Sequence, residues 1–187
     1  MTFDHILKEH SACMDRLAGI GPAVETAARI LSDTIGRGHK ILVCGNGGSA
    51  ADAQHFAAEI VGRFEKERKA FAAVALTTDT SILTALANDY SYDDIFARQV
   101  QGLGAKGDAL VGLSTSGNSE NVLRAMAEAK KTGMRTVALC GRDGGKLKGM
   151  ADCAVVVPAE NTARIQEAHI LVIHYFSMII ETGNMGG

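Results

Sequence analysis

Four hydroxyl side chains stand within six positions in the segment Leu113-Ser114-Thr115-Ser116-Gly117-Asn118-Ser119. The segment follows an apolar run, 108–113, and precedes a helical pattern at 121–131. A turn between a strand and a helix presents backbone N–H groups and the positive end of the helix dipole to an anion. Capping the helix would need only one hydroxyl. We therefore predict that this turn binds a phosphate group.

A glycine-rich turn, Cys44-Gly45-Asn46-Gly47-Gly48-Ser49-Ala50, follows the first predicted strand and opens a helix. It matches the loose dinucleotide pattern G-x-G-x-x-G/A. That pattern also requires an acid about 20 positions further on, and the first acid that follows the second strand, Asp79, comes too late. We interpret the glycines as a turn that lets a ligand approach the backbone.

Two segments carry residues that could transfer protons or bind a metal. His55 and Glu59 are four apart in a helical pattern, so they share one face. An isolated pair of this kind is usually a surface ion pair, but this one lies among apolar residues and soon after the glycine turn. The last helical segment adds Gln166, His169 and His174. The residue pattern alone leaves the choice between His169 and His174 open.

The apolar pattern predicts strands that alternate with helices. The expected strands are 40–44, 72–76, 109–113, 135–139 and 154–157, and the expected helices are 49–64, 80–87, 92–103, 120–132 and 163–181. Short, continuous apolar strands are typical of a parallel sheet covered on both faces. We therefore predict an α/β fold with a doubly wound, five-stranded parallel sheet.

Residues 1–36 precede the first strand and form a helical arm broken near 19–22, which we expect to pack on another subunit. The whole chain, 1–187, is predicted to be one domain, with the arm at 1–36 and the α/β core at 37–187.

Composition excludes several classes of partner. The 187 residues carry a net charge of −2 without long runs of one sign, so we expect no nucleic-acid or membrane partner. No apolar stretch approaches the roughly 20 residues that span a bilayer. The four cysteines are widely spaced, and the first residues lack the basic start and apolar centre of a signal peptide. These features predict a protein of the reducing cytoplasm.

Four segments taken together resemble the phosphoheptose isomerase family, a branch of the sugar isomerase (SIS) fold. They are C-G-N-G-G-S-A-A-D-A-Q-H-F-A-A-E, T-T-D-T-S-I-L-T-A-L-A-N-D, S-T-S-G-N-S and R-I-Q-E-A-H. The resemblance covers about residues 3 to 182 and implies a flavodoxin-like SIS sandwich. It also implies conversion of sedoheptulose 7-phosphate to D-glycero-D-manno-heptose 7-phosphate through an enediol, the first step of ADP-heptose and lipopolysaccharide core synthesis.

The resemblance assigns roles residue by residue. Glu59 is implied to be the base and His174 its partner acid/base. The implied substrate contacts are Asn46, Gly47, Gly48, Glu59, Asn88, Asp89, Ser114, Thr115, Ser116, Ser119 and Gln166. One zinc ion per subunit is implied on His55, Glu59, Gln166 and His174, in a homotetramer with active sites between subunits.

The implied zinc set raises a geometric problem. Gln166 and His174 are eight residues apart, which is roughly 12 Å along a helix. Either Gln166 lies at a frayed helix start, or two chains share one site.

Two other functions compete with the isomerase. A related branch of the fold is a non-catalytic scaffold that binds the replication initiator DnaA, and other SIS domains sense sugar phosphates beside a DNA-binding module. A scaffold does not require Glu59 and His174 together, and the chain has no length to spare for a DNA-binding module. The residues therefore favour the enzyme.

Overall fold

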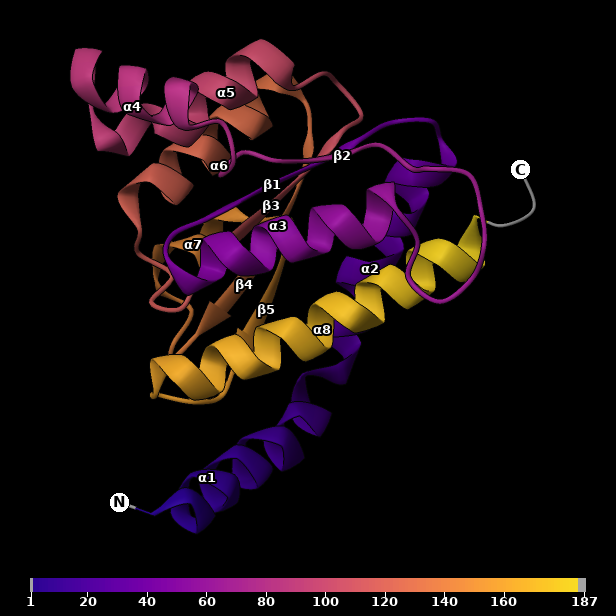
Figure 1. Ribbon diagram of the computed structural model, residues 1–187, viewed down its shortest axis with the longest axis vertical. Helices are drawn as coiled ribbons and strands as arrows, with labels where there is room; N and C mark the ends of the chain where they lie inside the picture. The colour runs from indigo at the N-terminus through magenta and orange to yellow at the C-terminus, as the bar shows by residue number, and fades with distance from the viewer. Residues whose placement is uncertain (1, 185–187) are drawn as a thin grey trace.

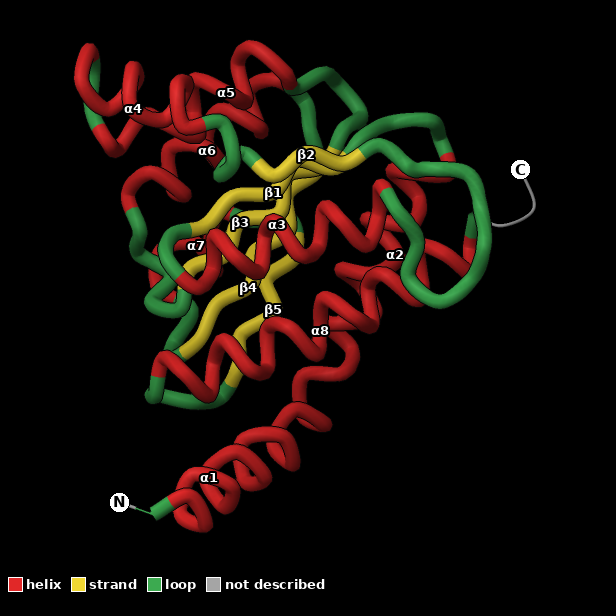
Figure 2. Tube along the Cα trace, viewed as in Figure 1, coloured by secondary structure: helices red, strands yellow, loops and turns green. Residues whose placement is uncertain are grey.

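The computed structural model describes residues 2–184 and contains one five-stranded parallel sheet between two layers of helices (Figures 1 and 2). The strand order is β2-β1-β3-β4-β5, and every neighbouring pair is parallel. The strands are β1 (Ile41–Gly45), β2 (Ala73–Ala75), β3 (Ala109–Ser114), β4 (Arg135–Gly141) and β5 (Cys153–Val157). The doubly wound α/β fold predicted from the sequence is confirmed.

Helices cover both faces of this sheet. The α-helices are α1 (Phe3–Arg16), α2 (Gly21–Gly36), α3 (Gly48–Val61), α4 (Thr80–Asp89), α5 (Ile95–Leu103), α6 (Glu120–Thr132), α7 (Gly145–Met150) and α8 (Thr162–Gly183), with 3-10 turns η1 (Leu17–Ile20) and η2 (Tyr92–Asp94). One face packs against α2, α3 and α8, and the other packs against α4 to α7. The helix α1 extends away from the sheet (Figure 1).

The strand β1 shows why both faces are apolar. Its side chains alternate across the sheet, so Ile41 and Val43 enter the core beneath α2, α3 and α8. Leu42 and Cys44 enter the core on the opposite face. All five residues of the strand are buried, which explains the continuous apolar run in the sequence.

The strand order places two loops at a topological switch point. The strand β1 lies between β2 and β3. The connection that leaves β1 leads to α3 on one face of the sheet, and the connection that leaves β3 leads to α6 on the other face. Gly45 pairs with Leu113 in the register, so the loops that follow begin side by side. Open α/β sheets bind ligands at the carboxyl ends of strands at such a point.

Three elements differ from the sequence prediction by more than two residues, and one of them is the expected helix 92–103, which is divided into η2 and α5. The helix α3 ends at Val61 rather than at Phe64, because Gly62 leaves helical geometry and the next backbone N–H groups bond to a side chain of α8. The six-residue α7 was not predicted, because it is too short to show a helical period. The expected break near 19–22 is confirmed by η1 and by the start of α2 at Gly21. Within residues 2–184, no helix has the length and apolar character needed to cross a bilayer.

Candidate functional site

The serine turn, residues 114–119, joins the end of β3 to the start of α6. Ser114 Oγ lies 2.8 Å from Ser119 Oγ and 3.4 Å from Ser116 Oγ, so three hydroxyls form one cluster. Ser119 occupies the N-cap position of α6, yet its side chain makes no capping hydrogen bond. Hydroxyls that gather beside an uncapped helix N-terminus favour an anion site over simple capping.

A glycine in the left-handed region fixes the shape of this turn. Gly117 has φ +66°, and a Cβ added there would lie 2.0 Å from the carbonyl oxygen of Gly144. The turn is therefore pressed against the segment that precedes α7. Asn118 strengthens this contact, because its Oδ1 accepts a hydrogen bond from the backbone N–H of Lys146 at 3.1 Å.

The loop after β1 is tied to the same region by side-chain amides. Asn46 and Asn121 exchange two hydrogen bonds of 2.9 Å, and the Tyr92 hydroxyl donates to Asn46 Oδ1 at 3.1 Å. Sequence reasoning missed Asn121, which is buried in the first turn of α6, and the exposed Tyr92. In the sequence, only their position next to segments predicted to form the site could have pointed to them. They fix the side chain of Asn46 next to the serine turn.

Two further predicted contact residues lie near Tyr92. Asn88 and Asp89 end α4, three to four residues before Tyr92, and both are exposed. The Asn88 amide donates a hydrogen bond to Asp89 Oδ1 at 2.8 Å.

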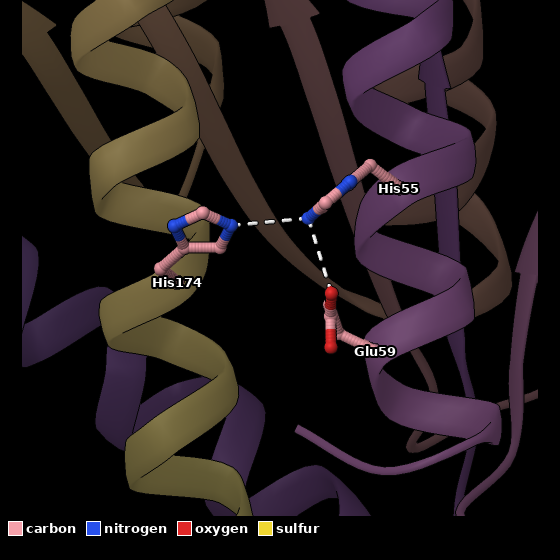
Figure 3. Close-up of side chains that lie close together, drawn as sticks. All are labelled: His55, Glu59 and His174. Carbon is pink, nitrogen blue, oxygen red and sulfur yellow. Dashed lines mark hydrogen bonds and ion pairs between the residues drawn. The ribbon is translucent and has the colours of Figure 1, made fainter. Parts of the chain in front are cut away.

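The residues His55, Glu59 and His174 converge between α3 and α8 (Figure 3). Nε2 of His55 lies 3.0 Å from Nε2 of His174 and 3.1 Å from Oε1 of Glu59. One donor atom from each residue lies within 4.8 Å of the others. The His55 side chain is 43% exposed and that of Glu59 is 22% exposed, so reactants can reach the cluster.

The donor set of this cluster fits zinc. Zinc bonds imidazole nitrogen and carboxylate oxygen at about 2.0–2.2 Å in tetrahedral sites, which separates ligand atoms by roughly 3.3 Å. The two measured contacts of His55, 3.0 and 3.1 Å, are close to that separation. Two ring nitrogens and one carboxylate oxygen also form an ordinary catalytic zinc set, which leaves a fourth position open.

The structure decides between the two histidines that the residue pattern left open. His169 is fully buried, and its Nε2 contacts the Cys140 carbonyl oxygen at 3.0 Å. Burial lowers the pKa of His169 to about 4, and the hydrogen bond that its ring donates to the Cys140 carbonyl oxygen opposes this shift. His174 is only partly buried and faces His55. His169 is therefore a core residue, because α8 turns it toward the sheet.

Gln166 lies in the second turn of α8, eight residues before His174. A Cβ added to Gly48 would lie 2.6 Å from Gln166 Nε2, so this side chain rests on the first turn of α3. The start of α8 is capped by Asn161, whose Oδ1 accepts from the backbone N–H of Ala163 at 2.9 Å. Gln166 is therefore held in a capped helix and does not lie at a frayed start.

The site residues of one chain thus form two groups, which we name by their side chains. The serine half-site comprises the serine turn, the loop 46–48 and Gln166, and the histidine half-site comprises His55, Glu59 and His174. Gly48 and Glu59 are eleven residues apart on α3, or about 16 Å along its axis. Gln166 and His174 are likewise about 12 Å apart along α8, so the two half-sites of one chain are separated on both helices.

Sequence reasoning also missed Asp52, which lies one turn before His55 on α3. Its Oδ2 is buried without a hydrogen-bond partner among the described residues. Burial raises the pKa of Asp52 to about 6, against the attraction of His55. The spacing of Asp52, His55 and Glu59 at i, i+3 and i+7 was the signal that could have revealed it.

Comparison with known proteins shows which family this chain belongs to. The fold and the site define a protein of the SIS-domain class, whose family model matches residues 7–141. Phosphoheptose isomerase of Helicobacter pylori is 51% identical over 183 residues, covering 95% of both chains. That of Citrifermentans bemidjiense is 53% identical over 176 residues, covering 94% of this chain and 92% of its own length.

Solved structures agree with these relatives. Phosphoheptose isomerase from Neisseria gonorrhoeae superposes with a TM-score of 0.91 at 46% identity, covering 96% of both chains. The enzyme from Francisella tularensis gives 0.93 at 38% identity and covers 97% of this chain and all of its own. The chain belongs to the phosphoheptose isomerase family, as the sequence motifs predicted.

Proposed function

We propose that this chain is an aldose–ketose isomerase that converts sedoheptulose 7-phosphate to D-glycero-D-manno-heptose 7-phosphate. One observation carries the proposal: a carboxylate and two imidazoles converge at Glu59, His55 and His174 in a chain 51% identical to a phosphoheptose isomerase. The same relatives favour the enzyme over the DnaA-binding scaffold.

The reaction moves a carbonyl from C2 to C1 by proton transfer. The carboxylate of Glu59 removes a proton from C1, the C1–H electrons form the C1=C2 bond, and O2 takes a proton to give the enediol. O1 then loses its proton, the C1=O bond forms, and Glu59 returns its proton to C2. His174 moves the proton between O1 and O2. No atom is gained or lost.

The serine half-site holds the substrate while protons move. We assign the phosphate to Ser114, Thr115, Ser116 and Ser119, and further contacts to Asn46, Gly47, Gly48, Asn88, Asp89 and Gln166. Short hydroxyls and a helix N-terminus bind phosphate without adding charge of their own. Fixing the far end of the sugar holds C1 and C2 beside Glu59, which lowers the entropic part of the barrier.

We also propose one zinc ion per subunit, held by His55, Glu59 and His174. When bound, zinc polarises the carbonyl and stabilises negative charge on the enediol oxygens. Glu59 would then serve both as a ligand and as the base, so its carboxylate would have to be released from the ion for proton transfer. Gln166 of a neighbouring subunit completes the set, because Gln166 of the same chain rests on Gly48.

The separation of the half-sites supports a homotetramer with shared active sites. The serine half-site of one chain meets the histidine half-site of another. An apolar stripe on α8 supports this arrangement, because Leu171 and Met178 are 49% and 37% exposed on the same face as His174. A cavity of about 390 Å³ lined by Leu17, Val24, Leu171 and Tyr175 borders the stripe. A second subunit would bury both.

The cellular setting and domain organisation are also proposals. The product is expected to feed ADP-heptose and lipopolysaccharide core synthesis. The four cysteines are free thiols, which is compatible with a cytoplasmic enzyme. We further propose that residues 1–187 act as one SIS domain, with α1 contacting another subunit.

Isotope exchange tests the reaction and the base together. Purified protein is incubated with sedoheptulose 7-phosphate in D2O, and the product is examined by NMR and mass spectrometry. We expect deuterium at C2 of the aldose product from the wild type and none from Glu59→Gln. Glu9→Gln is a matched control, since His5 and Glu9 form another i, i+4 pair, 3.2 Å apart, on α1. Deuterium incorporation by Glu59→Gln at the wild-type rate would exclude Glu59 as the base.

A further inference from the structure

The carboxylate of Glu181 is buried near the end of α8 and organises a loop that belongs to the other helix of the site. Its side chain is 2% exposed. Its oxygens accept hydrogen bonds from the backbone N–H groups of Phe64, Glu65 and Lys66 at 3.1, 3.0 and 2.9 Å. These three residues follow the end of α3. Glu181 therefore holds the segment that leaves α3 against α8.

Arg68 completes this arrangement from within the same loop. Its Nε donates to Glu181 Oε1 at 3.2 Å, and its side chain is 3% exposed. Its Nη2 donates to the carbonyl oxygen of Glu59 at 2.7 Å, and its Nη1 donates to that of Ile60 at 3.0 Å. Arg68 thus caps the carboxyl end of α3 with a positive charge, where unpaired carbonyls and the helix dipole favour one.

The pair touches both sides of the histidine half-site. On α3, Arg68 bonds to the backbone of Glu59 itself. On α8, Glu181 lies seven residues, or two turns, after His174. The loop that follows α3 also brings the centre of the Phe64 ring to 5.6 Å from the centre of the His174 ring. The spacing of α3 and α8 at this point sets the distance between Glu59 and His174.

We propose that Glu181 and Arg68 are positioning residues that fix His55 and Glu59 relative to His174. This inference rests on the proposed use of those three residues as the zinc and proton-transfer site. The pair clamps the two helices together just beyond the site, so that three donor atoms stay close enough for one ion. Metal sites depend on such outer contacts, whose loss typically weakens metal affinity.

The electrostatics of Glu181 agree with a clamp that is always charged. Burial alone would raise its pKa, but the three backbone N–H groups and Arg68 hold the pKa below its usual value. An ionised carboxylate holds the loop more firmly than a neutral acid would, because both of its oxygens accept hydrogen bonds from groups of fixed position. Removing one partner of such a buried ion pair leaves the charge of the other partner buried and unpaired.

Asp108 offers a matched control, because its hydrogen-bond partners among the described residues lie just before β1 and β3 rather than on α3 or α8. It is 2% exposed, and it accepts from the backbone N–H groups of Lys40 and Ala105 at 3.0 and 2.8 Å. Lys40 Nζ lies 2.5 Å from its Oδ2. It is therefore also a buried carboxylate that anchors backbone and one cation. Asp108 precedes β3, so its loss should destabilise the fold without moving α3 against α8.

The test compares Glu181→Gln with Asp108→Asn. Each amide replaces one acceptor oxygen with a donor, so each breaks a bond to a backbone N–H. Zinc chloride is titrated into each metal-free protein by calorimetry, and kcat and KM are measured on the reloaded enzymes. We expect Glu181→Gln to bind zinc at least about tenfold more weakly and Asp108→Asn to stay within about twofold of wild type. The kcat of Glu181→Gln should fall while its KM is unchanged.

Each outcome decides the matter. Equal weakening in both variants, or wild-type affinity and kcat in Glu181→Gln, would overturn the inference. If Glu181→Gln does not fold, Arg68→Lys replaces it, because lysine keeps the charge but cannot reach both Glu59 and Ile60 carbonyls. Arg68→Lys should then show the zinc and kcat losses, and wild-type behaviour would reject the clamp. If the wild type binds no zinc, the zinc proposal fails, and the clamp is judged by kcat alone.

Discussion

The two half-sites of this chain are built in opposite ways. The serine turn, which supplies the hydroxyls of the serine half-site, is local, since these hydroxyls lie within six consecutive residues and three of them contact one another. The histidine half-site joins residues 119 positions apart, and its geometry depends on how α3 packs against α8. The first is therefore visible as a motif, whereas the second exists only after folding. The difference implies that binding and catalysis can be disrupted separately.

Removing the base should have the largest effect and should spare the serine half-site. We expect Glu59→Gln to lower kcat by about 10³-fold, within the range that general acid–base catalysis supplies. The dissociation constant of inorganic phosphate should stay at the wild-type value, because the phosphate contacts are assigned to the serine turn and not to Glu59. Steady-state kinetics and phosphate titration measure the two quantities. Loss of both would show that the half-sites are not separable.

Trimming the serine cluster should have a smaller and different effect. Ser119→Ala removes the hydroxyl that lies 2.8 Å from Ser114 Oγ. We expect KM to rise about tenfold with kcat nearly unchanged, because one hydrogen bond to a charged group is lost equally from substrate and transition state. A fall in kcat at constant KM would instead place Ser119 beside the reacting carbons.

Mixing the two defects tests whether the half-sites of different chains meet. Ser114→Ala combined with Ser116→Ala disables one half-site, and Glu59→Gln disables the other. Randomly mixed subunits should regain about a quarter of wild-type activity, because a symmetric pair of unlike chains holds one intact and one doubly defective site. Co-expression followed by activity assay measures this. Mixed tetramers without regained activity would mean that each site belongs to one chain.

The smallest expected effect concerns Asp52, beside the histidine half-site. Its pKa of about 6 lies above the ordinary value near 4, so the folded state holds its proton more tightly than the unfolded state. Stability is therefore lost as pH rises from 4 to 6. Asp52→Asn should raise the free energy of unfolding at pH 7 by about 1 kcal/mol, a value reduced for partial exposure.

Urea unfolding of the metal-free protein at pH 4 and pH 7 measures this difference. The variant and the wild type should differ far less at pH 4, where Asp52 is protonated in the folded state and only about half ionised in the unfolded state. If the free energy of unfolding depended on pH equally in the two proteins, Asp52 would not be the group that destabilises the folded state at neutral pH.

Particular residues show where sequence reasoning succeeded and where it stopped. Glu120–Thr132 was predicted as α6 without error, since its helical period and flanking turns are local signals. The end of α3 was placed three residues late, because the loop is held by Glu181, which is more than 110 residues away. His169 and His174 could not be ranked, since their environments depend on which face of α8 meets the sheet.

The sequence by itself determined the strand and helix order, the serine turn and the family. These follow from local periodicity, turn chemistry and motifs that survive without knowledge of contacts. Only the tertiary structure decided that Gln166 rests on Gly48 while His174 faces His55, so that the predicted site divides into two halves. The physical reason is helix geometry: residues on one rigid helix keep their axial separation, and only packing between helices can bring donors together.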